Sequence, residues 1–266
     1  MGDSKATGAR HPSAIISPQA VLAEDVSVGP YTVIGPRVTL GEGCVIGSHV
    51  VLEGPAELGP RCRVHAFASM GSDPQDLKYQ GEETRLVVGP DNTFREFVTI
   101  NRGTAGGGGV TRIGASNFFM AYAHVAHDSH VGDHVIMANS ATLAGHVTVG
   151  DHSTVGAFSA VHQFCRVGPH AFIGGFSVVT RDALPFIKTV GDRNQARIYG
   201  INSIGLERNG VPKPVIDELK RAYRMLFRSD LNTGDALRRA RAATWTSAEV
   251  ALLFEFIETS ERGFVR

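Results

Sequence analysis

The chain has 266 residues, of which 42% are hydrophobic and 20% charged, with 26 basic residues against 26 acidic ones. The length suits one or two domains with a real core, and a net charge of zero gives no electrostatic footprint for DNA or RNA. We therefore expect no nucleic-acid partner. No run of residues approaches the ~18 apolar residues that a membrane span needs. Three cysteines cannot form a disulfide framework, so we expect a protein of the reducing cytoplasm. The first element, residues 1–11, is a polar tail without the apolar segment of a secretory signal.

A repeat of six residues follows the tail and organises residues 12–190. An apolar side chain recurs at every sixth position in three blocks, 16–70, 88–100 and 113–179, the last one residue out of step. Glycine often follows the apolar residue, and a small or slim residue stands four positions after it. This alternation is the hexapeptide pattern of a parallel β-helix. Because six residues cannot bury themselves, the rungs must stack, with strands of adjacent coils ~4.8 Å apart.

The pattern resembles the left-handed β-helix of hexapeptide-repeat acyltransferases, in which three rungs form one triangular coil. The left hand comes from this resemblance, because common crossover rules favour the opposite hand. Two segments break the repeat: the polar loop 71–87 and the loop 101–112, which contains four consecutive glycines. Loops ejected from a rigid solenoid commonly carry function. The glycine run lacks the lysine of a P-loop, so we interpret it as a flexible flap.

The period changes at about residue 191, where we expect a C-terminal helical domain, 191–266. Helical spacing covers 212–228, a second helix is expected at 235–243, and a third should run from Thr246 or Ser247 to Glu258. The fold class is therefore mainly β: a left-handed parallel β-helix of hexapeptide repeats with a C-terminal α-helical domain. Between residues 213 and 241, eight basic residues stand against four acidic ones, which indicates either a solvated face or a docking surface for an acidic protein.

Four histidines lie close together in the chain, and imidazole is a common zinc ligand. His124, His127, His130 and His134 fall on successive rungs that face different directions in a triangular coil. All four therefore cannot share one ion, although one or two could bind a metal at a subunit interface. We expect no metal site.

Residues three rungs apart should stack, and this spacing instead predicts a polar patch on one edge of the prism. Three columns of residues should meet there: His127, Gly145 and Gln163; Asp128, His146 and Phe164; Ala126, Ala144 and His162. An imidazole beside a carboxylate suits general-base catalysis, and an exposed glycine N–H can donate to a developing oxyanion. Polar residues that merely line a turn are the alternative interpretation.

Five strings along the chain identify a family. They are Gln-Asp-Leu-Lys-Tyr at 75–79, Arg-Glu-Phe-Val-Thr-Ile-Asn-Arg-Gly-Thr at 95–104, His-Val-Ala-His-Asp at 124–128, Leu-Ala-Gly-His at 143–146 and Ala-Val-His-Gln-Phe at 160–164. Together, in this order, they resemble the UDP-N-acetylglucosamine acyltransferases, which catalyse the first step of lipid A biosynthesis. The resemblance runs from about residue 11 to 266.

The resemblance implies transfer of an (R)-3-hydroxyacyl group from acyl carrier protein to the 3-hydroxyl of UDP-N-acetylglucosamine, by a homotrimer with active sites between subunits and without a cofactor. His127 matches the general base, Asp128 its partner and Gly145 the backbone donor to the oxyanion. Gly175 matches the end of the acyl pocket, where side-chain size limits chain length. The other matches to the substrate site are Gln75, Asp76, Lys78, His124, His146, His162, Gln163 and, near the nucleotide, Asn202 and Arg208.

Three other functions remain open. The related N-acyltransferase of the same pathway normally has an added N-terminal domain, for which the first rung at about Ile15 leaves no room. A zinc carbonic anhydrase on the same β-helix would use histidines between subunits, but would not explain loop 71–87 or the helices. A non-catalytic solenoid scaffold would not need His127 beside Asp128.

Overall fold

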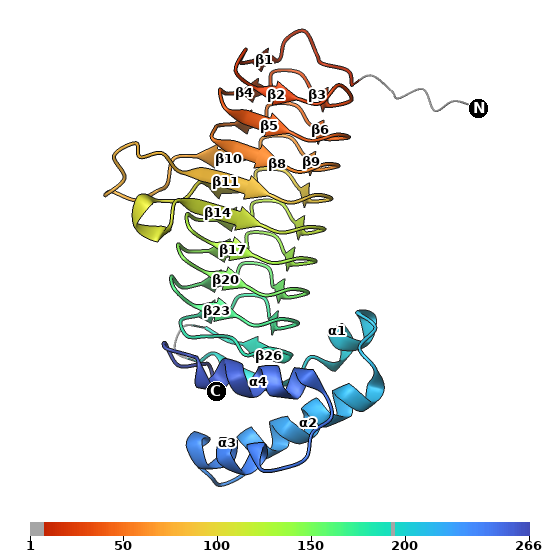
Figure 1. Cartoon of the computed structure of the whole chain (residues 1–266), viewed down its shortest axis with the longest axis vertical. Coiled ribbons are helices and arrows are strands. Elements are labelled where there is room, and N and C mark those ends of the chain that lie inside the picture. The colour runs from red at the N-terminus through yellow and green to blue at the C-terminus, as the bar shows by residue number, and fades with distance from the viewer. Residues whose placement is uncertain (1–7, 193–194) are drawn as a thin grey trace, which may run out of the picture.

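The computed structural model describes residues 8–192 and 195–266, which form a three-sided left-handed β-helix closed at one end by helices (Figure 1). Residues 1–7 of the expected tail lie outside this description. Residues 8–11 already belong to the solenoid, since the His11 N–H donates to the Val28 carbonyl at 2.9 Å and Arg10 forms a bridge with Val28. No helix in the described residues is long and apolar enough to cross a membrane.

The three sides of the prism are sheets, here called faces 1, 2 and 3, and all their strands are parallel except β27 at the end of face 3. Face 1 contains β1 (Ile15–Ile16), β4 (Val33–Ile34), β7 (Val51–Leu52), β10 (Ser69–Ser72), β13 (Thr99–Asn101), β16 (His124–Val125), β19 (Thr142–Leu143), β22 (Ala160–Val161) and β25 (Val178–Val179). Face 2 contains β2 (Val21–Leu22), β5 (Val38–Leu40), β8 (Ala56–Leu58), β11 (Arg85–Val88), β14 (Val110–Ile113), β17 (His130–Val131), β20 (Thr148–Val149) and β23 (Arg166–Val167). Face 3 contains β3 (Ser27–Val28), β6 (Val45–Ile46), β9 (Arg63–Val64), β12 (Thr93–Phe94), β15 (Phe118–Phe119), β18 (Ile136–Met137), β21 (Thr154–Val155), β24 (Phe172–Ile173), β26 (Ile187–Val190) and β27 (Arg197–Ile201).

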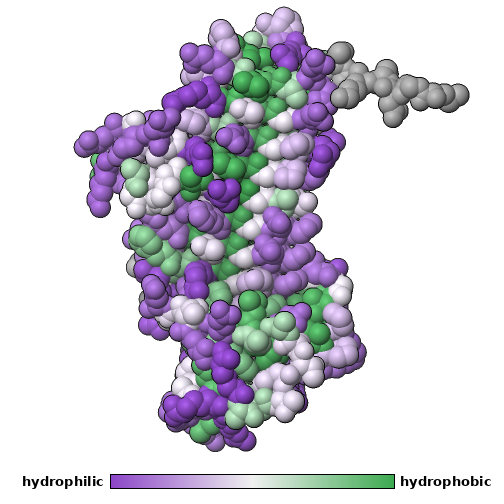
Figure 2. Space-filling view, in the orientation of Figure 1, coloured by the Kyte–Doolittle hydropathy of each residue, from purple (hydrophilic) through white to green (hydrophobic). Residues whose placement is uncertain are grey.

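The register confirms the triangular coil of three rungs. On face 1, His124 pairs with Thr142 in the next coil, which pairs in turn with Ala160. In the two-residue strands from β3 onward the second residue points inward and is buried, as Ile34 and Val125 are. Figure 2 shows a narrow hydrophobic stripe along the prism between hydrophilic side chains. The edge between faces 1 and 2 is called edge 1–2 below, and the others edge 2–3 and edge 3–1.

The glycine that follows the apolar residue of a rung does not form the turn at the corner of the coil. The left-handed conformation at most corners belongs to the third residue after the apolar one, such as His49 (φ 56°) or Asp128 (φ 58°). Gly29 has no positive φ, but a Cβ placed there would lie 2.7 Å from the carbonyl carbon of Gly47 in the next coil. These glycines therefore allow neighbouring coils to approach closely.

Both ejected loops leave from edge 1–2 and are shorter than the sequence suggests. Strands β10 and β11 leave only residues 73–84 outside the sheets, and β13 and β14 leave 102–109. The strands are longer than the repeat predicts, because residues at their loop ends still pair with the adjacent coil, as Arg85 does with Val110. Figure 1 shows both loops projecting from the same side of the prism.

The three expected helices are present, with bounds shifted by up to two residues. They are α2 (Lys213–Phe227), α3 (Thr233–Arg241) and α4 (Ala248–Glu258). The sequence did not predict β27, which runs antiparallel to β26, or the short helix α1 (Ser203–Arg208). The helices form their own core around residues such as Leu219 and Phe254, while Val265 returns to the core of the solenoid.

Candidate active site

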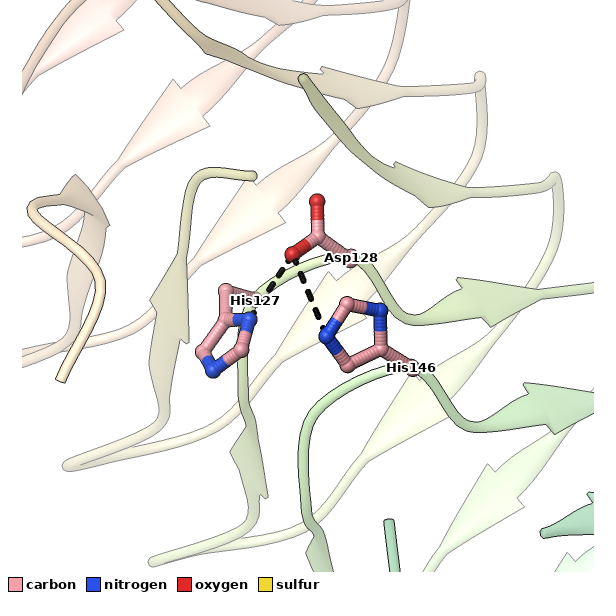
Figure 3. Close-up of side chains that lie close together, drawn as sticks. All are labelled: His127, Asp128 and His146. Atoms are coloured by element: carbon pink, nitrogen blue, oxygen red, sulfur yellow. Dashed lines mark hydrogen bonds and ion pairs between the residues drawn. The ribbon is translucent and has the colours of Figure 1, made fainter. Parts of the chain in front are cut away.

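A histidine and an aspartate meet on edge 1–2, in the turn between β16 and β17. The Nδ1 atom of His127 lies 2.8 Å from Oδ2 of Asp128 (Figure 3). The Asp128 side chain is fully buried, and that of His127 is 15% exposed. The left-handed backbone of Asp128 places this carboxylate beside the ring of the preceding residue. This confirms the predicted proximity of the two side chains.

The second ejected loop holds the Asp128 carboxylate in place. The Thr104 N–H donates to Oδ1 at 2.8 Å, the Thr104 hydroxyl donates to Oδ2 at 2.6 Å, and the Asp128 N–H donates to the Thr111 hydroxyl at 2.8 Å. A Cβ on Gly107 would lie 2.1 Å from Cγ of Asp128, so the loop needs glycine there to approach the carboxylate. Within the glycine run, Gly107 therefore lies against Asp128, whereas a Cβ on Gly106, Gly108 or Gly109 would meet nothing within 4 Å. The interpretation of the run as a flexible flap stays a prediction.

These hydrogen bonds also assign the tautomer of His127. Because the ionised carboxylate accepts from Thr104 and can only accept from the ring, Nδ1 of His127 carries a proton. In the neutral imidazole, Nε2 is then a free base. Thr104 and Thr111 were not among the predicted site residues, although Thr104 ends the second family string.

His146 completes a close group with His127 and Asp128. Its Nε2 lies 3.8 Å from Oδ2 of Asp128, and its ring meets that of His127 edge-on at 5.2 Å (Figure 3). The ring also stacks on Phe164 at 4.4 Å. Burial lowers the pKa of His146 below 6.5, and the neighbouring His127 adds to this effect, while the Asp128 charge opposes it. We therefore expect a neutral His146 at pH 7.

Gly145 lies against the ring of His127, one coil further along. A Cβ on Gly145 would come to 2.6 Å from Cε1 and 2.9 Å from Nε2 of His127. The N–H of Gly145 donates to no acceptor within residues 8–192 and 195–266. It is therefore available to a ligand beside the imidazole.

The other predicted histidines lie near this group with different environments. His124 is directed outward from β16, with its Nδ1 2.7 Å from the Thr99 hydroxyl, and burial, with a contribution from His127, lowers its pKa below 6.5. His162 and Gln163 lie two coils below His127, where His162 Nδ1 is 3.2 Å from the carbonyl of Gln163. The Gln163 side chain is exposed.

A cavity of about 330 Å³ opens beside this group, between the two ejected loops and edge 1–2. The first loop contributes Asp76 and Lys78, the second Thr104, and the edge His146 and Phe164. The Lys78 N–H donates to the Asp76 carboxylate at 3.0 Å, which fixes this part of the loop. Gln75 is exposed on the same loop and does not line the cavity.

Three predicted residues lie elsewhere in the single chain. Gly175 is on edge 3–1, after β24. Asn202 is buried at the start of α1, where its amide accepts from the Gly205 N–H at 3.3 Å and donates to the His170 carbonyl at 3.1 Å. Arg208 is exposed at the end of that helix, on the side of the molecule opposite the loops (Figure 1). One chain therefore does not bring these residues to His127.

The same group could also present ligands to a metal ion. One ligand atom each from His127, Asp128 and His146 lies within 4.8 Å of the others. Two imidazoles and a carboxylate are a donor set that zinc accepts. However, the carboxylate oxygen that both rings approach already accepts hydrogen bonds from Thr104 and His127. A metal would have to displace them.

Comparisons with known proteins agree on one family. A family model described as UDP N-acetylglucosamine O-acyltransferase, domain 2, matches residues 182–265, and one for bacterial transferase hexapeptide repeats matches residues 146–181. The acyl-[acyl-carrier-protein]–UDP-N-acetylglucosamine O-acyltransferase of Halorhodospira halophila is 54% identical over 96% of this chain and 98% of its own length. The structure of LpxA from Acinetobacter baumannii matches with a TM-score of 0.91 and 43% identity, covering 97% of this chain and 99% of that one. LpxA of Bacteroides fragilis, a UDP-N-acetylglucosamine acyltransferase, has a TM-score of 0.92 and 37% identity, covering 96% and 99% of the two chains.

Proposed function

The chain belongs to the family of acyl-[acyl-carrier-protein]–UDP-N-acetylglucosamine O-acyltransferases, and from this premise we propose how its residues carry out the reaction. It is an acyltransferase that moves an acyl group from acyl carrier protein to an oxygen of UDP-N-acetylglucosamine. In our proposal the acyl group is (R)-3-hydroxyacyl, the acceptor is the sugar 3-hydroxyl, and the product enters lipid A biosynthesis.

His127 is the general base of this proposal, and the hydrogen bond from its Nδ1 to Asp128 is the observation that carries it. Nε2 takes the proton of the sugar hydroxyl while the oxygen attacks the thioester carbonyl carbon. The resulting imidazolium is stabilised by the buried Asp128 charge, which Thr104 holds in place. When the tetrahedral intermediate collapses, the C–S bond breaks and the imidazolium returns its proton to the departing sulfur.

Gly145 supplies the oxyanion contact in this mechanism. Its N–H has no acceptor in the described chain, and the residue lies against the imidazole that generates the nucleophile. A donor fixed in the backbone stabilises the negative charge that develops on the carbonyl oxygen without reorganisation. Asp76 and Lys78, which line the cavity with His146, are placed to contact the sugar and acyl group.

A homotrimer would bring together the parts that one chain separates. The first residues of the face 1 strands carry no full charge, and large side chains on the adjoining edge 3–1 are 40–73% exposed. These exposed side chains are Tyr31, Phe67, Phe97, Tyr122, Phe158 and Phe176. Apolar surface of this extent usually marks an interface. Edge 3–1 of one copy against face 1 of the next would place Gly175 beside the neighbour's His127.

The remaining parts of the proposal concern ligands and location. Arg208 would contact the nucleotide from a neighbouring subunit. Asn202 has the same expected role, but the hydrogen bonds of its amide within α1 and to His170 give it a structural role as well. No cofactor is required because the thioester is already activated. The cytoplasmic location stays a prediction.

The test is acyl transfer to radiolabelled UDP-N-acetylglucosamine from a panel of (R)-3-hydroxyacyl carrier proteins. An alkali-labile ester product supports the O-acyltransferase. Transfer only to an acceptor with a free 2-amino group, giving an alkali-stable amide, would indicate the N-acyltransferase, because the nitrogen of UDP-N-acetylglucosamine is already acylated. The absence of transfer from every donor by folded protein would contradict the proposal and favour a scaffold. Zinc bound at one ion per chain, with CO₂ hydration instead of transfer, would favour the carbonic anhydrase.

A further inference from the structure

Arg102 is the first residue of the second ejected loop, and its side chain reaches across to the first. Strand β13 ends at Asn101, which pairs with Ser72 at the end of β10, so the two loops leave the prism from adjacent coils (Figure 1). The Arg102 N–H donates to the Ser72 carbonyl at 3.1 Å. Its side chain is only 14% exposed, although arginine is rarely buried unless its charge is paired. The proposed mechanism gives this arginine no role.

The guanidinium group of Arg102 contacts the first loop at its base and at its far side. At the base, Nη1 donates to the Gly71 carbonyl at 2.8 Å, and Nη2 pairs with the Asp73 carboxylate. At the far side, Nη2 and Nε donate to the Tyr79 hydroxyl at 3.0 and 3.3 Å. One planar group therefore joins the two ends of the segment 71–79. The rigid fork of arginine donors allows this, whereas the compact ammonium of lysine does not reproduce it.

Tyr79 passes this constraint to residues that line the active-site cavity. Its hydroxyl donates to the Glu82 carbonyl at 2.9 Å, and its N–H donates to the Asp76 carbonyl at 3.0 Å. The Lys78 N–H donates to the Asp76 carboxylate at 3.0 Å. The turn 76–79, which presents Asp76 and Lys78 to the cavity, is thus closed at Tyr79, the residue that Arg102 holds.

Two other contacts tie the first loop to the solenoid, and neither involves the turn 76–79. Arg37 pairs with Glu83 at 3.3 Å, but both side chains are more than half exposed, and exposed ion pairs contribute little to stability. The Asn101 amide donates to the Asp73 carbonyl at 2.7 Å, which fixes only the base of the loop. The contact of Arg102 with Tyr79 differs from both because it reaches the turn itself.

The backbone that follows Arg102 leads to the base. Thr104 comes two residues later, and its N–H and hydroxyl hold the Asp128 carboxylate beside His127. The side chain of Arg102 therefore anchors the first loop, while its backbone begins the segment that supports the base. Arg102 links the turn 76–79 to the group that orients His127.

We propose that Arg102 is a positioning residue for UDP-N-acetylglucosamine, because it holds the turn 76–79 so that Asp76 and Lys78 contact the bound sugar nucleotide. This rests on the proposed function, which gives these two residues that contact. Arg102 is not among the residues that line the cavity. It therefore acts through Tyr79 and the turn, and not on the reacting atoms.

The test measures steady-state kinetics of Arg102→Gln and Arg102→Lys in the full chain. We expect KM for UDP-N-acetylglucosamine to rise at least ~10-fold in both variants, because each loses charge-assisted hydrogen bonds to the loop. The acidic limb of the kcat profile against pH, which reports the protonation of His127, should not move. Arg37→Gln is the matched control, since it removes an exposed ion pair of the same loop and should leave KM unchanged.

A double variant separates positioning from a general loss of structure. If Arg102 acts through the turn, Arg102→Gln should add little to the rise in KM that Lys78→Ala already causes, because residues that act as one unit are not additive. Full additivity would overturn the proposal, and so would an unchanged KM in Arg102→Gln. A shifted acidic limb with an unchanged KM would also overturn it, because Arg102 would then act on Asp128 and His127.

Amide hydrogen exchange tests the hold on the turn without turnover. Protection of the Lys78 and Tyr79 N–H groups should be lost in Arg102→Gln and retained in Arg37→Gln, because only the first substitution frees the turn. Lost protection in a protein that transfers no acyl group would support the contact while the reaction assignment failed. Retained protection in Arg102→Gln, with acyl transfer intact, would overturn the inference while the proposed function stood.

Discussion

Gly145 and His127 are in contact between adjacent coils, and the contact leaves no room for a side chain on the glycine. A methyl group at Gly145 would lie 2.6 Å from Cε1 of the imidazole, a distance that real Cβ atoms do not show. The ring therefore keeps its position against Gly145 only while residue 145 has no Cβ. One residue both supplies the proposed oxyanion donor and allows the base to occupy its place.

Gly145→Ala should consequently lower kcat by at least ~10-fold with little change in melting temperature. The added methyl displaces the ring, and loss of a positioned base costs ~100-fold or more. Steady-state kinetics and thermal unfolding of the variant provide the check. Gly234→Ala is the matched control, since a Cβ there has only ordinary contacts at 3.5 Å or more. Equal kcat in both variants would show that the contact is unimportant.

His127→Ala should lower turnover by at least ~100-fold while the protein stays folded, because the sugar hydroxyl loses its base. Acyl transfer to radiolabelled UDP-N-acetylglucosamine measures the effect, and far-ultraviolet circular dichroism monitors the fold. His130→Ala, which removes an exposed histidine of β17, should retain activity. Near-normal turnover in His127→Ala would remove this residue from the role.

Gly175→Met should shorten the preferred acyl chain. A Cβ at Gly175 lies 3.3 Å from the Ala157 carbonyl oxygen, so a small shift accommodates the side chain within its own subunit. The rest of the methionine would project from edge 3–1 into the proposed acyl pocket. Competition among donors of different chain length measures the preference, and an unchanged profile would contradict the pocket assignment.

Arg224→Glu should raise KM for acyl-carrier protein, with an effect that weakens at high salt. Arg224 is exposed on α2. Arg221, on the same basic face, is a poorer test residue than the sequence suggests. Its guanidinium lies 4.0 Å from the Trp245 ring and donates to the Thr244 carbonyl, so reversing its charge would also damage the helical domain. Arg63→Glu, on face 3, is the control, and an equal KM in both variants would indicate that the basic face is only solvated.

The stability of the fold should decrease as the pH falls below about 6.5. Burial lowers the pKa of His124, His146 and His170 from that value, so the unfolded chain takes up protons that the folded chain does not. Each such proton reduces the free energy of unfolding by up to about 1.4 kcal/mol per pH unit until the pH passes the lowered pKa. Urea denaturation at several pH values between 8 and 5 measures the slope. His170→Asn should flatten it, and an unchanged slope in this variant would contradict the prediction.

Much of the fold could be predicted from the sequence because each coil stacks on the next with the same spacing of three rungs. Counting three rungs along the chain placed Gly145 against His127 and His146 beside Asp128, as the structure confirms. It could not predict the contact of Thr104 with Asp128, because the ejected loop between them breaks the repeat. Contacts within columns follow from counting, whereas contacts of a loop depend on how it folds back.

The C-terminal region shows the same limit. Helix α2 has a long amphipathic pattern and was predicted, but α1 has six residues and too little periodicity. Asn202 caps this helix. From the sequence, only a ligand-binding role was predicted for this residue. Strand β27 pairs antiparallel with β26, an arrangement that a pattern of parallel coils does not predict.

The two ends of the solenoid are closed differently, and this should produce a gradient of local unfolding along the prism. At the lower end Val265 reaches into the core and the helices cover the last coil, whereas in the first described coil the inward-facing Ile16 and Leu22 are only partly buried. Because each coil contacts only its neighbours, opening can start at the free end without disturbing the middle. Amide hydrogen exchange should therefore be fastest in the first coils and slow around His127, so that the reaction centre is shielded by distance from the fraying end.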